Sequence, residues 1–344
     1  MLQHVRPPRL SAAANWAPLA RFIAAEDRLA RRAAQGRFSA FFYEFCRFGV
    51  KQAWACLFGG AMVALIIATH LWYPRGAALA RYDFLFLAAL AIQVAMLAFR
   101  LETWEEAKVI LLFHVVGTIM EIFKTSVGSW IYPEPAFFRI GGVPLFSGFM
   151  YAAIGSYMAR AWRLFDFRFT RHPPLWTLFV LAGAIYVNFY SHHYTVDVRY
   201  ALFAFAVLLF SRTVIHYRVW EEYRQMPLLL ACFLTALFVW IAENIGTVTR
   251  TWTYPHQTAG WSMVSLGKLG SWFLLLFLSY ALVAIVNRPR AFAGGDSDTA
   301  SAHADLSKAC ASASNPSASH PASMNEPTPA AFKAASSSPG RPAR

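Results

Sequence analysis

Two glutamates within apolar segments are the residues of this sequence best suited to chemistry. Glu121 is followed nine positions later by Trp130-Ile-Tyr-Pro, and Glu243 is followed nine positions later by Trp252-Thr-Tyr-Pro. A carboxyl group inside a bilayer costs about 2.5–3.5 kcal/mol, so such residues usually mark a functional site. Nine helical residues rise about 13–14 Å, which would put each glutamate near mid-membrane if each tryptophan lay at the interface.

Further polar residues in or beside the apolar segments are candidates for supporting roles: His114, Lys124, Asn244 and Lys268. His114 falls on the same helical face as Glu121. Lys124 lies one helical turn beyond Glu121, where it could form an ion pair. Lys268 is expected either to extend towards the interface or to pair with one of the carboxyl groups.

Two interpretations of the glutamates remain open. In the first, both are buried polar groups that only hold helices together. In the second, they face each other across a shared polar cavity. Two facing carboxyl groups would leave one protonated and one ionised near neutral pH, which suits acid/base chemistry or proton-coupled transport.

The glutamate motif belongs to a longer internal repeat. Trp-Glu-Glu precedes each copy, at 104–106 and at 220–222. The ordered set predicts two halves of four spans each. An even number of spans per half would give both copies the same orientation, as a parallel repeat about the membrane normal.

The composition predicts an all-α, polytopic transmembrane bundle of about eight spans. Hydrophobic residues make up 57% of the chain and charged residues only 14%, against roughly 25% charged in soluble domains. A spanning helix needs about 20 mostly apolar residues. Eight segments qualify: 50–72, 83–101, 106–127, 144–163, 174–191, 200–217, 227–248 and 264–287.

The remaining segments differ in composition from this transmembrane domain, 38–290. Residues 1–37 are basic and predict a cytoplasmic or interfacial segment, whereas 291–344 are rich in Ala, Ser and Pro and predict a disordered tail. The loops predicted on the side of both termini carry more Lys and Arg, so both termini are expected in the cytoplasm. The net charge of +13 therefore reflects membrane topology and does not predict nucleic-acid binding.

Small residues predict close helix packing, and the sequence predicts no cofactor or metal site. Gly148, Gly155 and Ser156 would let a neighbouring helix approach segment 144–163. The cysteines have no metal or redox spacing, and no phosphate-binding loop or zinc-protease motif occurs. The adjacent pair His192-His193 is interpreted as part of an ordinary interfacial loop.

Two resemblances are carried by these motifs. The segment 104–163, with Glu121, the Trp130-x-Tyr-Pro element and Gly142-Val-Pro, resembles the uncharacterised bacterial membrane family called domain of unknown function 817, and 240–265 resembles its second half. This resemblance implies an integral protein of a bacterial inner membrane, without an activity. A weaker similarity, through Glu121, Gly128 and Tyr132, is to the carotenoid hydratases, which are membrane enzymes.

Three functions are compatible with the sequence. The first is a carrier with a polar site at the midplane between two repeats. The second is a membrane enzyme that acts on an isoprenoid or lipid, with Glu121 or Glu243 as the acid or base. The third is a non-catalytic scaffold. The expected partners are membrane lipids and an unidentified small-molecule or lipid substrate.

Overall fold

The computed structural model describes residues 36–74 and 76–292. The expectations for the N-terminal segment 1–37 and the tail 291–344 fall almost entirely outside these residues. The elements, in chain order, are α2 (Arg37–Ala55), α3 (Leu57–Trp72), α4 (Arg81–Ala98), α5 (Trp104–Ser126), β1 (Arg139–Ile140), β2 (Val143–Pro144), α6 (Phe146–Phe165), β3 (Arg168–Thr170), α7 (Leu175–Ser191), α8 (Arg199–Phe210), β4 (Val214–Arg218), β5 (Tyr223–Pro227), α9 (Leu228–Val248), the 3-10 helix η1 (Pro255–Gln257) and α10 (Leu266–Val286).

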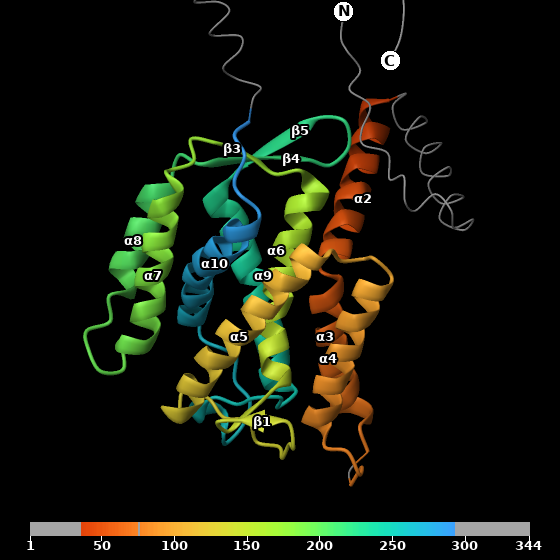
Figure 1. Ribbon diagram of the computed structural model, residues 1–344, viewed down its shortest axis with the longest axis vertical. Helices are drawn as coiled ribbons and strands as arrows, with labels where there is room; N and C mark the ends of the chain where they lie inside the picture. Colours follow the sequence, from red (N-terminus) through yellow and green to blue (C-terminus); the bar gives the residue numbers. More distant parts are fainter. Residues whose placement is uncertain (1–35, 75, 293–344) are drawn as a thin grey trace, which may run out of the picture. The chain divides into compact units, whose positions relative to one another are not determined.

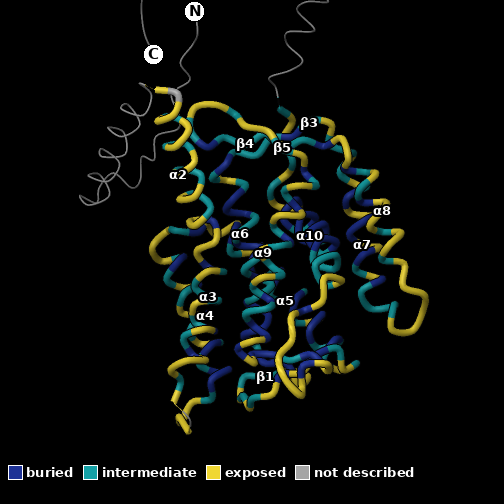
Figure 2. Tube along the Cα trace, turned by 180° about the vertical axis from the view of Figure 1, so that it is seen from behind, coloured by how far each residue is buried: buried dark blue, intermediate teal, exposed yellow. Residues whose placement is uncertain are grey.

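The described chain is mostly helical, as predicted, and its helices run up and down beside one another. Figure 1 shows α5, α6, α9 and α10 in the centre, with α2, α3 and α4 on one side and α7 and α8 on the other. Strands β3, β4 and β5 form an antiparallel sheet at one end of the helices, and the β1–β2 hairpin lies at the other end. In Figure 2 the outer helix α8 carries much of the exposed surface.

The helices do not support eight spans or two four-span repeats. Among the described residues, α4, α5, α9 and α10 are long and apolar enough to cross a membrane, and α2 with α3 adds a fifth span if that pair, bent by 69°, is counted as one. The predicted span 200–217 fails because α8 ends at Phe210 and a strand follows. Twelve helical residues rise about 18 Å, well short of a core of about 30 Å.

The polarity of α6 explains another departure from the prediction. The sequence placed Arg160 and Arg163 at the cytoplasmic end of the predicted span 144–163, and both lie within α6. Arg160 is fully buried and pairs with Glu102, with 2.7 Å between the two charged groups. Arg163 pairs with Glu106 at 2.9 Å. The buried Arg160 is therefore part of the packing between helices and carries no information about membrane orientation, whereas the Arg163 side chain is 47% exposed.

Close packing of α5 on α6 confirms the role predicted for the small residues. A Cβ atom at Gly148 would lie 2.5 Å from His114 Nδ1, and one at Gly155 would lie 2.7 Å from the Phe113 ring. Thr103 and Glu106 form a capping box that fixes the start of α5. These contacts hold α5, and therefore Glu121, in a fixed position against α6.

The sheet end contains an acidic residue with several favourable partners. Asp166 ends α6 in the left-handed region, at φ 47°. Its carboxylate accepts a hydrogen bond from the Tyr223 hydroxyl at 2.6 Å and pairs with Arg168 and Arg218. Burial opposes its ionisation, but the Tyr223 hydrogen bond and the two arginines outweigh burial and hold the pKa of Asp166 below its usual range.

We therefore expect Asp166 to make the fold sensitive to acid. Its pKa is lower in the folded than in the unfolded chain, so its contribution is present above about pH 4 and is lost as the pH falls through the folded-state pKa. Asp166→Asn keeps a side chain that tolerates the left-handed backbone and should remove this contribution. Thermal unfolding of both proteins between pH 3 and 7 measures it, and equal pH slopes would contradict the prediction.

Candidate functional site

The two Trp-x-Tyr-Pro segments pair directly with each other. Ile131 and Thr253 form an antiparallel bridge, with each amide donating to the other's carbonyl at 3.0 Å. The rings of Trp130 and Tyr254 meet edge to face across this bridge, 6.0 Å apart. Each segment follows the C-terminal end of a helix, α5 or α9, so the bridge brings the glutamate-bearing ends of these helices to one site.

Glu121 is buried and holds three hydrogen bonds. Oε2 accepts bonds from Trp130 Nε1 and the Tyr132 hydroxyl, and Oε1 accepts one from the Tyr151 hydroxyl, all at 2.7 Å. Its own motif supplies two of these donors because α5 ends at Ser126 and the chain folds back. The predicted rise of nine residues was therefore wrong: Glu121 lies five residues from its helix end, about 7.5 Å.

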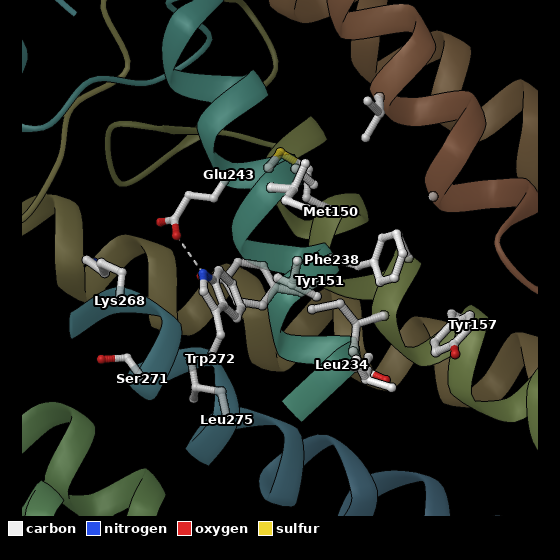
Figure 3. Close-up of a pocket in the computed structure, with 18 of the residues that line it drawn as sticks. Met150, Tyr151, Tyr157, Leu234, Phe238, Glu243, Lys268, Ser271, Trp272 and Leu275 are labelled. Atoms are coloured by element: carbon white, nitrogen blue, oxygen red, sulfur yellow. Dashed lines mark hydrogen bonds between the residues drawn. The ribbon is translucent and has the colours of Figure 1, made fainter. Parts of the chain in front are cut away.

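Glu243 forms a similar but smaller set of contacts. It is buried on α9, where it accepts hydrogen bonds from the Tyr254 hydroxyl and from Trp272 Nε1, the latter at 2.6 Å. Figure 3 shows the Trp272 bond. Trp252, the counterpart of Trp130 in the second motif, instead packs against Gly246, where a Cβ atom would overlap its ring.

Lys268 joins the two halves of the site. It lies in the first turn of α10, and its ammonium is 4.7 Å from the Trp130 ring centre and 4.6 Å from that of Tyr254. A cation over an aromatic face is attracted by the ring. Its charge also interacts with Glu243 and Glu121. The two carboxyl groups and one ammonium thus surround the Trp130–Tyr254 contact.

A cavity of about 1330 Å³ runs from this site along the bundle. Its lining includes both glutamates and Lys268 at one end and Tyr217, on β4, at the other. On α9 the lining residues extend from Ala231 to Ile245, about 21 Å of helix. Figure 3 shows aromatic and aliphatic side chains lining the cavity beyond the glutamate. The cavity is therefore long, mostly apolar, and lined by charged side chains of both signs at one end.

The side of the cavity reaches the surface of the bundle. Phe45 on α2 and Phe238 on α9 both line the cavity, and both are exposed, Phe238 by 71%. Leu234, one turn before Phe238, is also exposed. Because α9 is apolar and long enough to span a membrane, this opening faces hydrocarbon when α9 crosses a bilayer.

The other residues predicted for the site make no hydrogen bond or ion pair with Glu121 or Glu243 among the described contacts. His114 packs on Phe149, with ring centres 4.5 Å apart, and does not line the cavity. The Asn244 side chain holds the backbone of Val264 before α10, through a bond of 2.9 Å from the amide. The expected ion pair between Lys124 and Glu121 is absent from the described contacts, because Lys124 points to the end of α7 and contacts His193 Nε2 at 2.7 Å.

Tyr151 and Trp272 belong to the site but were missed in the sequence. Trp272 lies four residues after Lys268 and so shares its helix face. Tyr151 follows Gly148 by three residues on α6. Both spacings were visible signals. What the sequence did not reveal was that α6 and α10 bring these faces towards the glutamates of α5 and α9.

Comparisons with known proteins agree with this description of the chain. The profile of the family described as "Protein of unknown function (DUF817)" matches residues 44–280. A Bacillus subtilis (strain 168) protein described as "Uncharacterized protein YoaT" is 42% identical over 241 residues, which cover 70% of this chain and 90% of that protein. No solved structure matches the chain. The similarity to carotenoid hydratases is not confirmed by these matches.

Proposed function

The chain belongs to the DUF817 family, and because this membership brings no activity with it, we propose from the site that it is a membrane enzyme. It binds an elongated apolar molecule, of the isoprenoid or lipid class, and acts on it by acid/base chemistry at Glu243. The observation that carries this proposal is a long apolar cavity that ends at two hydrogen-bonded carboxyl groups.

The two glutamates have different roles in this proposal. A carboxylate offers about four acceptor positions. Glu121 uses three of them on Trp130, Tyr132 and Tyr151, so it fixes the aromatic wall of the site. Glu243 uses two, on Tyr254 and Trp272, and keeps acceptor capacity for a substrate proton. Glu243 is therefore the acid or base, and Glu121 is a positioning residue.

The surroundings of Glu243 suit a transfer of protons in a site away from bulk water. Lys268 supplies a positive charge that balances a carboxylate when Glu243 is ionised. Trp272 also lines the cavity, and its ring can stabilise positive charge that develops on an apolar substrate, whereas Trp130 and Tyr254 already hold the Lys268 ammonium. General acid/base catalysis of this kind contributes roughly 10²–10⁴-fold to a rate.

A carrier is the second candidate, and one observation favours it. The glutamate end of the cavity also carries polar side chains from α5, α7 and α8, namely Lys124, His192 and Arg199. These side chains would suit a polar solute. The rest of the lining is apolar and opens beside α9, where a lipid-soluble molecule enters more readily than a solute from water. A non-catalytic scaffold would be expected to have closely packed helices, and a cavity of this size is not expected between such helices.

We also propose a location in a bacterial cytoplasmic membrane, with the sheet end facing the cytoplasm. That end carries Arg168 on β3, Arg218 on β4 and Arg224 on β5, and the chain leaves it through residues 288–290 with two more arginines. Basic residues near span ends favour the cytoplasmic side. The glutamate end would then lie towards the opposite side.

The test compares lipid extracts of a strain that lacks the gene and is complemented with variants. Glu243→Gln is a suitable change because the glutamine oxygen can still accept from Trp272 while its amide donates to Tyr254. We expect this variant to fold, to lose roughly 100-fold or more of the activity, and to reproduce the lipid profile of the deletion strain. Mass spectrometry of the extracts measures this.

Two further variants complete the test. Glu105→Gln removes a carboxylate from an exposed position of α5, and it should restore the wild-type profile. Glu121→Gln should reduce the activity less than Glu243→Gln, because glutamine can retain the hydrogen bonds of Glu121. A wild-type lipid profile in the Glu243→Gln strain would end the case for this residue as an acid or base.

A further inference from the structure

Lys124 is a buried cation without an anionic partner among the described residues. Its side chain is 4% exposed, and no ion pair in the described part of the chain includes it. Its ammonium contacts His193 Nε2 at 2.7 Å and His192 Nε2 at 3.4 Å, and it lies 4.2 Å from the Phe189 ring centre. Buried charges are normally paired with an opposite charge. An anion bound beside this ammonium would supply that charge.

Other basic groups meet at the same end of the cavity. Lys124, Arg199 and Lys268 line it, and their charges interact with one another. They come from three elements: α5, the start of α8 and the first turn of α10. Like charges gathered in a cavity repel each other, and the carboxyl groups of Asp197, Glu121 and Glu243 offset this repulsion.

The acidic groups nearby are already engaged. Asp197 pairs with Arg199 at 2.7 Å and accepts a hydrogen bond from Asn188. Glu121 and Glu243 accept hydrogen bonds from tryptophan and tyrosine donors. Hydrogen bonds from these neutral donors leave the negative charge of an ionised glutamate in place, and that charge offsets the charge of Lys268. Lys124 has no carboxylate within ion-pair distance among the described residues, and its close polar partners are the imidazoles of His192 and His193.

From this juxtaposition we infer that the occupant of the cavity is a long-chain amphiphile with a phosphate head, whose phosphate binds at the Lys124 ammonium. This inference rests on the proposed function and names its class of substrate. A phosphate carries up to two charges and three acceptor oxygens, so it matches donors arriving from several directions better than a carboxylate does. The apolar lining takes the tail.

The dimensions of the cavity agree with such a molecule. Pockets for drug-sized ligands occupy roughly 300–1,000 Å³, and this cavity of about 1330 Å³ is larger. Glu121 precedes Lys124 by three residues of α5, a rise of about 4.5 Å. A phosphate at Lys124 therefore puts the first bonds of the tail beside the carboxyl groups, and that is where the acid/base step takes place.

Three probes separate the head from the tail. Hexadecyl phosphate has both, hexadecanol has the tail with a neutral head, and inorganic phosphate has the head alone. Binding to the full-length protein in dodecyl maltoside micelles is measured by native mass spectrometry and by the shift in the midpoint of thermal unfolding. We expect hexadecyl phosphate to bind roughly 10–100-fold more tightly than hexadecanol, because a hydrogen bond between charged groups typically changes the affinity by about this factor.

The variants assign this preference to Lys124. Lys124→Met should lose the preference for hexadecyl phosphate, whereas Lys124→Arg keeps the cation and should retain most of it. Lys108→Gln removes an exposed lysine from the same helix and should bind all probes as the wild type does. If Lys124→Met is misfolded by size-exclusion chromatography, Lys124→Gln replaces it, because its amide can still donate to the histidines but carries no charge.

The outcomes are distinct. Equal binding of hexadecyl phosphate and hexadecanol by the wild type overturns the inference, and so does an unchanged preference in Lys124→Met. Tight binding of inorganic phosphate alone would show a site for free phosphate and would also overturn it. Glu243→Gln removes a neighbouring negative charge and should bind hexadecyl phosphate at least as tightly as the wild type. If phosphate selectivity fails while Glu243→Gln still alters the lipid profile, the proposed function stands without this inference.

Discussion

Replacing Glu102 with leucine is expected to lower the free energy of unfolding by about 3–5 kcal/mol, the usual cost of breaking a buried ion pair. Glu102 lies between α4 and α5 and accepts bonds from Arg160 Nη2 and Ser156 Oγ, each at 2.7 Å, and from Gln93. Leucine leaves the fully buried guanidinium of Arg160 without a counter-charge. Denaturant titration in detergent, followed by circular dichroism, measures the loss.

Two controls separate the ion pair from simple loss of an acidic residue. The double variant Glu102→Leu, Arg160→Met removes both charges and should recover most of the stability, because buried pairs replaced by apolar residues often cost nothing. Glu105→Leu breaks an exposed pair with Lys108 and should change the unfolding free energy by less than about 1 kcal/mol. A double variant as unstable as Glu102→Leu would contradict this account of the pair.

Replacing Glu121 with leucine should have a comparable effect at the candidate site. The change leaves three buried donors, on Trp130, Tyr132 and Tyr151, without their acceptor. Each unsatisfied donor costs roughly 1–3 kcal/mol, so the loss is on the order of 5 kcal/mol. Unfolding monitored by the fluorescence of the chain's 12 tryptophans measures the loss of stability.

Glutamine at the same position provides the matched comparison. Its oxygen can accept from Trp130 and Tyr132, and its amide can donate to the Tyr151 hydroxyl, so each of the three side chains keeps a hydrogen bond to residue 121. We expect Glu121→Gln to stay within about 1.5 kcal/mol of the wild type. If glutamine and leucine destabilise equally, the hydrogen bonds of Glu121 do not hold the site together.

The two halves of the site have similar motifs but make different contacts. Glu121 and Glu243 each face a tyrosine from their own motif, but the tryptophan donors differ: Trp130 comes from the first motif, and Trp272 comes from α10. Where the first half has Lys124, the second has Gly246, and Trp252 fills the space against it. The first half therefore supplies a basic group to the cavity, and the second supplies the carboxyl group with acceptor capacity to spare.

Several properties were determined by the sequence alone because they depend on composition and local spacing. The excess of apolar residues predicted a helical membrane protein, and the repeated glutamate motif identified both carboxyl groups. The resemblance to the DUF817 family rested on the same motifs and is confirmed. The small residues Gly148 and Gly155 correctly predicted the close packing of α6 on its neighbour, since only a missing side chain permits that approach.

The tertiary structure decided which helices form, how long they are and which faces meet. Hydropathy did not separate α8 from β4, because Val214 and Ile215 closely follow the apolar residues of α8 and a short apolar stretch suits either conformation. Spacing along one helix suggested that Lys124 pairs with Glu121. Instead, Trp130 donates to the Glu121 carboxylate, and Lys124 contacts His192 and His193 at the end of α7. Contacts between distant segments, such as the Ile131–Thr253 bridge, bring the parts of the site together. Local spacing cannot predict these contacts, because they depend on how the helices pack.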